Sequence, residues 1–265
     1  MRISFTQVDA FSGEPFGGNP AAVMPLTAWL DDQVLQRIAE ENNLSETAFL
    51  VPADGDDADF DLRWFTPTSE VALCGHATLA SGHVVLESGT SLTTVRFRTR
   101  QAGILEVARA DSGYTLALPA WGPTATDLPA YVAALGLDRA DATLWHDKGY
   151  ALVVVPDEAT VRWLEPDQRA LKAAGMAVVI VAAPGDATDV VSRVFTPAYG
   201  IDEDPVTGSA HAVMVPYWAD RLGRDRFTAF QASARGGRLT CRLDGDRVVL
   251  GGACVTVIEG SFLLP

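Results

Sequence analysis

The sequence predicts an α+β fold of two similar domains, each with curved antiparallel strands wrapped around one long apolar helix. Two observations predict it. A Phe-Thr-Pro triplet occurs at residues 65–67 and again at residues 195–197, close to half of the 265-residue chain apart. Each triplet is followed by a polar turn and then by an apolar, helix-like segment, which ends at Leu86 or Leu222. Because two copies exclude a solenoid, two similar domains that face each other are the simplest interpretation.

Strands dominate the first half. Short apolar or alternating runs predict them at residues 3–11, 21–24, 44–51, 92–97, 104–107 and 114–118. A helix is expected over residues 30–42, where apolar side chains recur at helical spacing and Asp31 and Asp32 lie in the first turn. A Gly- and Pro-rich loop joins the first two strands. Such loops let a backbone approach a ligand closely, although they are more often plain turns.

The second half repeats this order after a Pro- and Gly-rich linker at residues 119–129. Helices are predicted at residues 130–135, 167–174 and 210–222, and strands at residues 151–155, 178–184, 227–232, 239–243, 248–250 and 254–258. Asp244-Gly245 is a tight-turn signal, and Gly251-Gly252 is expected to break the strand at residues 248–250 before the last strand begins. The predicted domains cover residues 1–120 and 129–257, with the tail 258–265 as a segment that can return to the first domain.

Composition and charge narrow the class of protein. A formal charge of −14 argues against nucleic acid and anionic membranes as partners, because phosphate repels an acidic surface. Three cysteines without a CxxC pair indicate a reducing compartment. The first residues read as a strand and not as a signal peptide, and no uncharged apolar stretch approaches the roughly 18 residues that span a bilayer. The expectation is a soluble, cytoplasmic protein.

The polar turns before the two apolar helices are the candidate binding sites. Pro205 should hold Asp204 extended, and Gly208 and Ser209 are residue types that begin helices. In the first half the corresponding helix starts near Gly75. Because the amides and the dipole of a helix N-terminus favour an anion, the start of each of these two helices is a candidate binding site for a carboxylate.

Three side chains offer acid–base chemistry in the first half. Glu46 begins a predicted strand and has no acidic counterpart around residues 176–179; it is either a solvated charge at a strand end or a general base. His76 lies at a helix start, where the dipole disfavours imidazolium, so a neutral, hydrogen-bonding ring or a simple polar cap is expected. Cys74 is either a thiolate at a helix N-terminus or a small buried residue.

Other common sites are not indicated. The sequence lacks GxSxG around Ser209, a P-loop lysine, a GxGxxG motif that opens a helix after a strand, and HExxH. His76 and His83 share a helical face, but they are two turns apart and no Cys or acid completes a ligand set in the sequence pattern. No metal and no organic cofactor are therefore expected.

Four segments, at residues 11–23, 43–49, 74–81 and 202–210, resemble the signature segments of the phenazine-biosynthesis isomerase (PhzF-like) family. Together they span both halves of the chain. The broader superfamily is similar to diaminopimelate epimerase, whose first cysteine motif resembles residues 69–75. At that enzyme's second cysteine this sequence has Asp204-Pro205-Val206 instead, which argues against a two-thiol racemisation.

The resemblance implies two domains of diaminopimelate epimerase-like fold, related by a pseudo-twofold axis with the active site in the cleft between them. It also implies a homodimer, a small-molecule carboxylate substrate and no cofactor. The residues carried over by motif are Glu46 as the catalytic proton shuttle, His76 and Asp204 as further catalytic residues, and Asn19, Gly75, Gly208 and Ser209 as substrate-binding residues.

Three functions remain open from the sequence. The first is an isomerase in which Glu46 moves a proton between two carbons on one face of the substrate, similar to the isomerisation of dihydro-hydroxyanthranilate to an aminoketone. The second is an epimerase or racemase of an amino-acid-like carboxylate that uses Cys74 as a base. The third is a non-catalytic binder of a small metabolite on the same fold.

Overall fold

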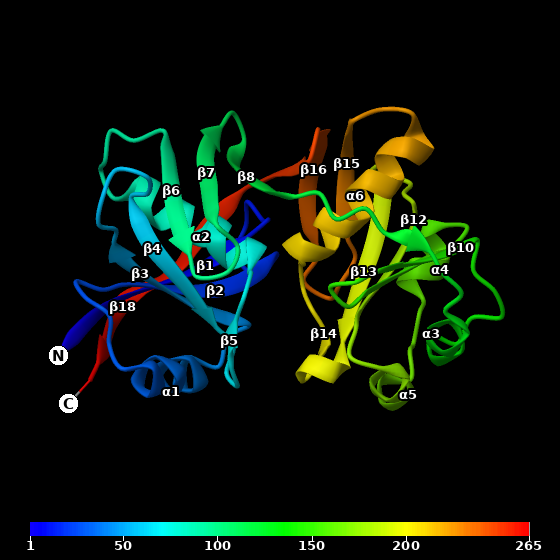
Figure 1. Cartoon of the computed structure of the whole chain (residues 1–265), viewed down its shortest axis with the longest axis horizontal. Helices are drawn as coiled ribbons and strands as arrows, with labels where there is room; N and C mark the ends of the chain where they lie inside the picture. The colour runs from blue at the N-terminus through cyan, green and yellow to red at the C-terminus, as the bar shows by residue number, and fades with distance from the viewer. Residues whose placement is uncertain (265) are drawn as a thin grey trace. The chain divides into compact units, whose positions relative to one another are not determined.

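The computed structural model describes residues 1–264, which form two compact units (Figure 1). Unit 1 comprises Met1–Ala117 together with the chain from Gly251 onward, and unit 2 comprises Leu118–Leu250. The return to unit 1 thus begins at Gly251, earlier than the tail 258–265 considered from the sequence. Within the described chain, no helix is both long and apolar enough to cross a membrane.

Unit 1 is a sheet around one helix. Its strands are β1 (Arg2–Ala10), β2 (Asn19–Pro25), β3 (Glu46–Pro52), β4 (Phe60–Phe65), β5 (Glu70–Val71), β6 (Thr94–Thr99), β7 (Ile104–Ala110), β8 (Gly113–Pro119) and β18 (Cys254–Leu263). Its helices are α1 (Asp32–Asn42) and α2 (Gly75–Glu87). β1 pairs antiparallel with both β2 and β18, so the first and last strands of the chain lie side by side (Figure 1).

Helix α2 is the centre of unit 1. It contacts β1, β2, β3, β6, β7 and β18, and ten of its 13 residues are buried, most of them apolar or small. A helix that is apolar on nearly all sides is stable only when it is enclosed. A Cβ on Gly82 would lie 2.3 Å from Cγ1 of Val107, so the approach of α2 to β7 depends on glycine. The predicted α+β class, with strands wrapped around a central helix, is confirmed.

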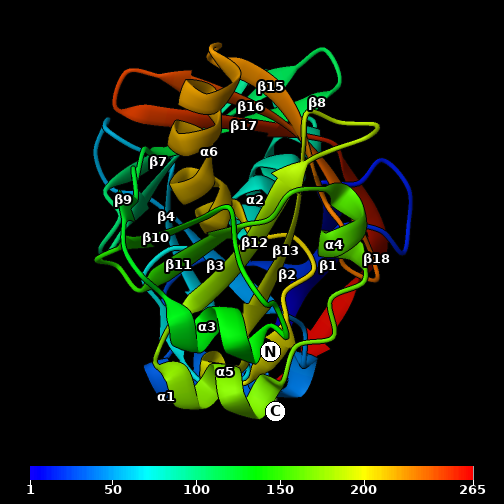
Figure 2. The same ribbon diagram turned by 90° about the vertical axis from the view of Figure 1, so that its right-hand side faces the viewer.

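Unit 2 has the same plan. Its strands are β9 (Thr124–Ala125), β10 (Ala142–His146), β11 (Tyr150–Val154), β12 (Val178–Pro184), β13 (Val190–Thr196), β14 (Ile201–Glu203), β15 (Arg226–Gln231), β16 (Gly237–Asp244) and β17 (Arg247–Gly252). Its helices are α3 (Pro129–Ala134), α4 (Glu158–Arg162), α5 (Gln168–Ala174) and α6 (Gly208–Leu222), with a 3₁₀ turn at Pro197–Tyr199. Helices α3 and α5 pack side by side (Figure 2).

Strand pairing repeats in the two units. In unit 1, β2 pairs parallel with β3, β3 antiparallel with β4, and β4 parallel with β6. In unit 2, β11 pairs parallel with β12, β12 antiparallel with β13, and β13 parallel with β15. The sheets are therefore mixed and not purely antiparallel as expected. Parallel neighbours need a crossover, and helices supply it. In unit 1, α1 connects β2 to β3 and α2 lies between β4 and β6. In unit 2, α4 and α5 connect β11 to β12 and α6 lies between β13 and β15.

An arginine–glutamate pair recurs beside each Phe-Thr-Pro triplet. Arg63 binds Glu70 through two hydrogen bonds of 2.8 Å, and Arg193 binds Glu203 through bonds of 2.7 and 2.8 Å. Arg63 also donates a hydrogen bond to Asp32 at the start of α1, and Arg193 donates one to the carbonyl oxygen of Leu164, which follows α4 in the chain. Each arginine thereby ties the short strand before the central helix to the crossover helix on the opposite face.

Several local predictions need correction. The predicted linker contains β9, and neither β10 nor α4 was predicted. Helix α6 begins at Gly208, two positions before the expected start. Strand β17 continues through Gly251 and Gly252, where it was expected to break; a Cβ on Gly252 would lie 2.4 Å from Cδ1 of Phe11, so this glycine makes room for an aromatic ring.

Substitution Glu203→Gln should destabilise unit 2, because the side chain of Arg193, 14% exposed, would keep its charge without its only ion-pair partner among the described residues. We expect a loss of about 2–3 kcal/mol in urea unfolding. Asp244→Asn, which removes the exposed ion pair to Arg242, is the matched control and should cost less than about 1 kcal/mol. Equal losses in both variants would contradict this account.

Candidate active site

Glu46, His76 and Asn19 meet at the start of helix α2. Asn19 and Glu46 are the first residues of the parallel strands β2 and β3, which are paired so that Ala21 lies opposite Glu46. Thr47 accepts a hydrogen bond from Asn42 of α1, so Glu46 points to the other face, toward α2. His76 is the second residue of α2. Parallel strands that begin at one edge thus place two polar side chains beneath a helix N-terminus.

The contacts around His76 are short and buried. Its Nε2 lies 3.0 Å from Oε2 of Glu46, at ion-pair distance but without hydrogen-bond alignment. Its Nδ1 lies 3.1 Å from Nδ2 of Asn19. The side chains of His76 and Glu46 are 5% and 15% exposed. Glu46 is therefore not the solvated strand-end charge that was one alternative from the sequence.

The orientation of the Asn19 side-chain amide is linked to which nitrogens of the His76 ring carry a proton. As oriented, its nitrogen donates to Nδ1, so a neutral ring carries its proton on Nε2, toward Glu46. Imidazolium has a proton on both nitrogens, and it requires the amide reversed so that oxygen faces Nδ1. A proton can therefore lie between His76 and Glu46 in either ionisation state.

The pKa of His76 is shifted in the direction opposite to the one that the expected neutral ring requires. Burial by itself lowers the pKa of His76, but the contacts of the ring with Cys74 and with the Glu46 carboxylate outweigh burial and raise the pKa well above 6.5. Burial, with the charge of Glu46 adding to it, raises the pKa of the Cys74 thiol to about 11, so Cys74 is uncharged at neutral pH and Glu46 supplies the effective charge. The helix-dipole argument failed because it considered only the local sequence. A carboxylate from another strand contributes more than the dipole.

Cys74 is a buried thiol and not a thiolate. It is the residue before α2, and its Sγ lies 3.5 Å from Nδ1 of His76. A helix N-terminus lowers the pKa of a thiol, but burial has the larger effect at this position. Of the two alternatives from the sequence, the small buried residue is the one that fits.

Glu46, Cys74 and His76 are also the residues that can approach a metal ion. One ligand atom from each lies within 4.8 Å of the other two. The sequence pattern suggested no such set, because these residues come from two separate elements. Metal binding would need thiolate and neutral imidazole, whereas the pKa values of Cys74 and His76 are both raised. The sulfur and the carboxylate also lie nearest to different ring nitrogens. The group is better suited to hold protons.

The predicted residues of unit 2 gather at the start of α6. Gly208 and Ser209 are its first two residues, as Gly75 and His76 are in α2. The Thr207 hydroxyl donates to the carboxylate of Asp204 and does not cap the helix. Val178 begins β12 as Glu46 begins β3, so unit 2 has no acid at the corresponding position. Asp204 and Ser209 are half-buried, and their role in a site stays a prediction.

Two residues near α6 were missed from the sequence. Gln231 accepts a hydrogen bond of 2.8 Å from the Thr207 amide and donates one of 2.7 Å to the Asp204 carbonyl oxygen. His211 donates from Nδ1 to the Thr207 carbonyl oxygen at 2.8 Å, and burial lowers its pKa to about 4. His211 follows Gly208 and Ser209 closely in the sequence and could have been considered with them, whereas the position of Gln231 depends on the pairing of β15 with β13.

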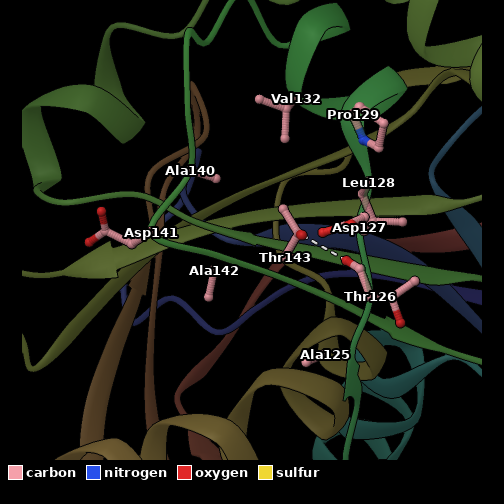
Figure 3. Close-up of a pocket in the computed structure, with 10 residues that line it drawn as sticks. All are labelled: Ala125, Thr126, Asp127, Leu128, Pro129, Val132, Ala140, Asp141, Ala142 and Thr143. Carbon is pink, nitrogen blue, oxygen red and sulfur yellow. Dashed lines mark hydrogen bonds between the residues drawn. The ribbon is translucent and has the colours of Figure 1, made fainter.

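A groove of ≈ 700 Å³ lies elsewhere in unit 2 (Figure 3). It is lined by ten residues, Ala125–Pro129, Val132 and Ala140–Thr143. Thr143 closes one side by donating to the Thr126 carbonyl oxygen at 2.7 Å. No predicted site residue lines this groove, and its carboxylates, Asp127 and Asp141, have no histidine or cysteine beside them in the lining. It is not the candidate active site.

The ionisation of His76 should depend on Glu46. In an imidazole NMR titration His76 should titrate well above pH 6.5, and in Glu46→Gln its pKa should fall below 6.5, because burial then acts without the opposing charge. The internal control is His211, which should titrate near pH 4 in both proteins. If the pKa of His76 is the same in Glu46→Gln as in the unaltered protein, a group other than Glu46 determines the ionisation of the ring.

Comparison with known proteins identifies the family. The family model of phenazine biosynthesis-like proteins, PhzC-PhzF, matches residues 8–260. An uncharacterized isomerase of Pseudomonas aeruginosa is 48% identical, and the match covers 100% of both chains. The human phenazine biosynthesis-like domain-containing protein is 39% identical over 98% of this chain and 99% of its own.

Solved structures agree. The crystal structure of a PhzF-family protein from Enterococcus faecalis matches with a TM-score of 0.92 and 44% identity, over 100% of both chains. A hydroxyproline epimerase from Agrobacterium vitis, only 15% identical, matches with a TM-score of 0.65 over 98% of this chain and 92% of its own, which shows a shared fold. The chain therefore belongs to the PhzC-PhzF family of phenazine biosynthesis-like proteins, and it is an isomerase with the diaminopimelate epimerase-like fold.

Proposed function

We propose that the protein is a cofactor-independent isomerase that moves a proton between two carbons of a small carboxylate substrate. The observation that carries this proposal is the half-buried Glu46 carboxylate, 3.0 Å from the buried His76 ring. A carboxylate in such a place is a general base within reach of a substrate proton. The repeat supports a single base, because Val178 occupies the corresponding position in unit 2.

The number of protons is conserved in this reaction. Glu46 takes a proton from a carbon next to a double bond, and the electron pair left behind forms a new double bond as the old one shifts. Glu46, now a carboxylic acid, delivers a proton to the far carbon on the same face, and in D₂O the carboxyl proton exchanges with solvent before this delivery, so that deuterium enters the product. His76 as imidazolium stabilises the carboxylate before and after the transfer. Its position, fixed by Asn19, keeps the carboxylate aimed at the substrate.

The start of α2 supplies a place for the substrate carboxylate. Cys74 precedes the helix without a side-chain cap, and Gly75 is the first helical residue. Amides of such a first turn donate to an anion. We propose the same substrate-binding role for Gly208 and Ser209 in α6, with Asp204 as a further polar group. For the substrate class we propose cyclic unsaturated amino acids such as trans-2,3-dihydro-3-hydroxyanthranilate.

The second candidate is an epimerase or racemase. It is favoured by one observation, the 3.5 Å contact between the Cys74 sulfur and His76, which resembles an activated thiol. Its weakness is the pKa of about 11 for Cys74, since an uncharged thiol is a poor base at neutral pH. The two candidates use different side chains, so substitutions separate them.

Glu46→Gln should abolish isomerisation. With trans-2,3-dihydro-3-hydroxyanthranilate in D₂O we expect kcat to fall by about 10²–10⁴-fold, together with loss of deuterium entry into the product carbon. Glu40→Gln, an exposed change on α1, is the matched control and should behave as the unaltered protein. Full turnover by Glu46→Gln would remove the proposed base. No turnover or exchange by the unaltered protein would reject this substrate.

Cys74→Ala should leave most of the activity in place. Because the thiol is buried and uncharged, we expect kcat within about tenfold of the unaltered protein, the change coming from the lost packing beside His76. The measurement is the same deuterium exchange, with racemisation of amino-dicarboxylates followed in parallel by chiral chromatography. Complete loss of activity in Cys74→Ala, with Glu46→Gln still active, would favour the epimerase.

A further inference from the structure

The loop between β1 and β2 has an unfavourable backbone. Phe11 and Phe16 have φ values of +64° and +73°, in the left-handed region that non-glycine residues avoid at a cost of about 1–2 kcal/mol each. Gly18 has a φ of +63°, and a Cβ there would lie 2.1 Å from the Ala10 carbonyl oxygen. Specific contacts must compensate for this strain.

Each end of the loop has its own anchor. At the first end the Phe11 ring packs against Gly252, and the Ser12 amide donates to the Ala253 carbonyl oxygen at 3.1 Å. At the far end the Phe16 amide donates to Oδ2 of Asp9 at 2.9 Å. Asp9 is only 2% exposed. A buried carboxylate is unfavourable unless it accepts hydrogen bonds, so the bond from the Phe16 amide stabilises Asp9 and holds the loop against it.

The loop leads directly into the candidate active site. Gly18 precedes Asn19, which is completely buried and lies opposite Ala10 in the β1–β2 pairing, and the amide Nδ2 of Asn19 lies 3.1 Å from Nδ1 of His76. Asp9 itself lies opposite Pro20. Adjacent residues of a strand face opposite sides of the sheet, so the side chain of Asp9 lies on the face opposite to that of Asn19.

We propose that Asp9 is a positioning residue of the isomerase site: by holding Phe16 it fixes the strained loop that sets the Asn19 amide against His76. This rests on the proposed function of His76 and Glu46, but it makes a claim about geometry that can be measured without substrate. Asp9 acts through Asn19, and a shift of the loop of even 1 Å would separate the amide from the ring.

The test compares Asp9→Ala with Asn19→Ala by ¹⁵N NMR of the histidine rings, which reports the tautomer and the ionisation of His76. Asp9→Ala should change the His76 signals in the same direction as Asn19→Ala, and adding it to Asn19→Ala should produce no further change. Asp9→Asn keeps an acceptor oxygen and should restore the original signals. Deuterium exchange should fall by about 10²-fold in Asp9→Ala, mainly in kcat.

The matched control is Asp59→Ala. Asp59 also lies in unit 1 and accepts a backbone hydrogen bond, from the Arg96 amide at 2.7 Å, at the opposite end of the sheet. It should lower thermal stability as Asp9→Ala does and leave the His76 signals unchanged. Unaltered His76 signals in Asp9→Ala would overturn the proposal, because Asp9 would then serve stability alone.

The experiment also covers a variant that does not fold, and it separates the role of Asp9 from the proposed isomerisation. Where Asp9→Ala does not fold, Asp9→Ser replaces it, since its short hydroxyl cannot reach the Phe16 amide. If the His76 signals respond as expected but no exchange occurs in any protein, the positioning role stands and the proposed isomerisation fails. If exchange is normal and the signals do not respond, the isomerisation stands and the role of Asp9 fails.

Discussion

The site depends on the parallel pairing of β2 with β3. An antiparallel pair would place the first residue of one strand beside the last residue of the other. The parallel register instead brings Asn19 and Glu46 to one edge, with Ala21 opposite Glu46. This pairing needs helix α1 as a crossover, and Leu35 and Ile38 bury that helix against the outer face of the sheet. The second crossover is α2, which therefore crosses the inner face with its N-terminus above the same edge.

The repeated arginine explains how each helix start is held. β5 and β14 have only two and three residues, too few to hold a strand in place by backbone bonds alone. Glu70 in β5 and Glu203 in β14 each accept two hydrogen bonds from an arginine, Arg63 or Arg193, and these side-chain bonds anchor the short strands. In unit 1 the chain passes within a few residues from Glu70 to Gly75. The salt bridge thus fixes the direction in which α2 begins.

The sequence allowed the scaffold to be predicted better than the chemistry. The Phe-Thr-Pro repeat indicated two similar domains, and Glu46 was noticed because the repeat lacks an acid at the other position. Parallel pairing could not be predicted, since strands of either kind share the same period of two. The raised pKa of His76 was not predicted, because Glu46 is thirty positions away in the sequence. Arginine stands two residues before each repeated Phe, a signal that was present and not used.

The pKa shifts imply that the two units respond to pH in opposite ways. The folded pKa of His76 is raised, so its stabilising pair with Glu46 is complete below the ordinary value of 6.5 and is lost as pH rises through the higher folded value. His211 has the reverse behaviour: it is buried neutral, and its contribution is complete above 6.5 and is lost as pH falls toward about 4. A buried cation can persist at His76 because Glu46 supplies a counter-charge. At His211 the only recorded bond of the ring is the one that Nδ1 donates to a carbonyl oxygen, and Nε2 has no partner among the described residues. In the two similar units, the histidines near the starts of the central helices therefore have pKa values shifted in opposite directions, and the raised one belongs to the histidine that lies beside a carboxylate.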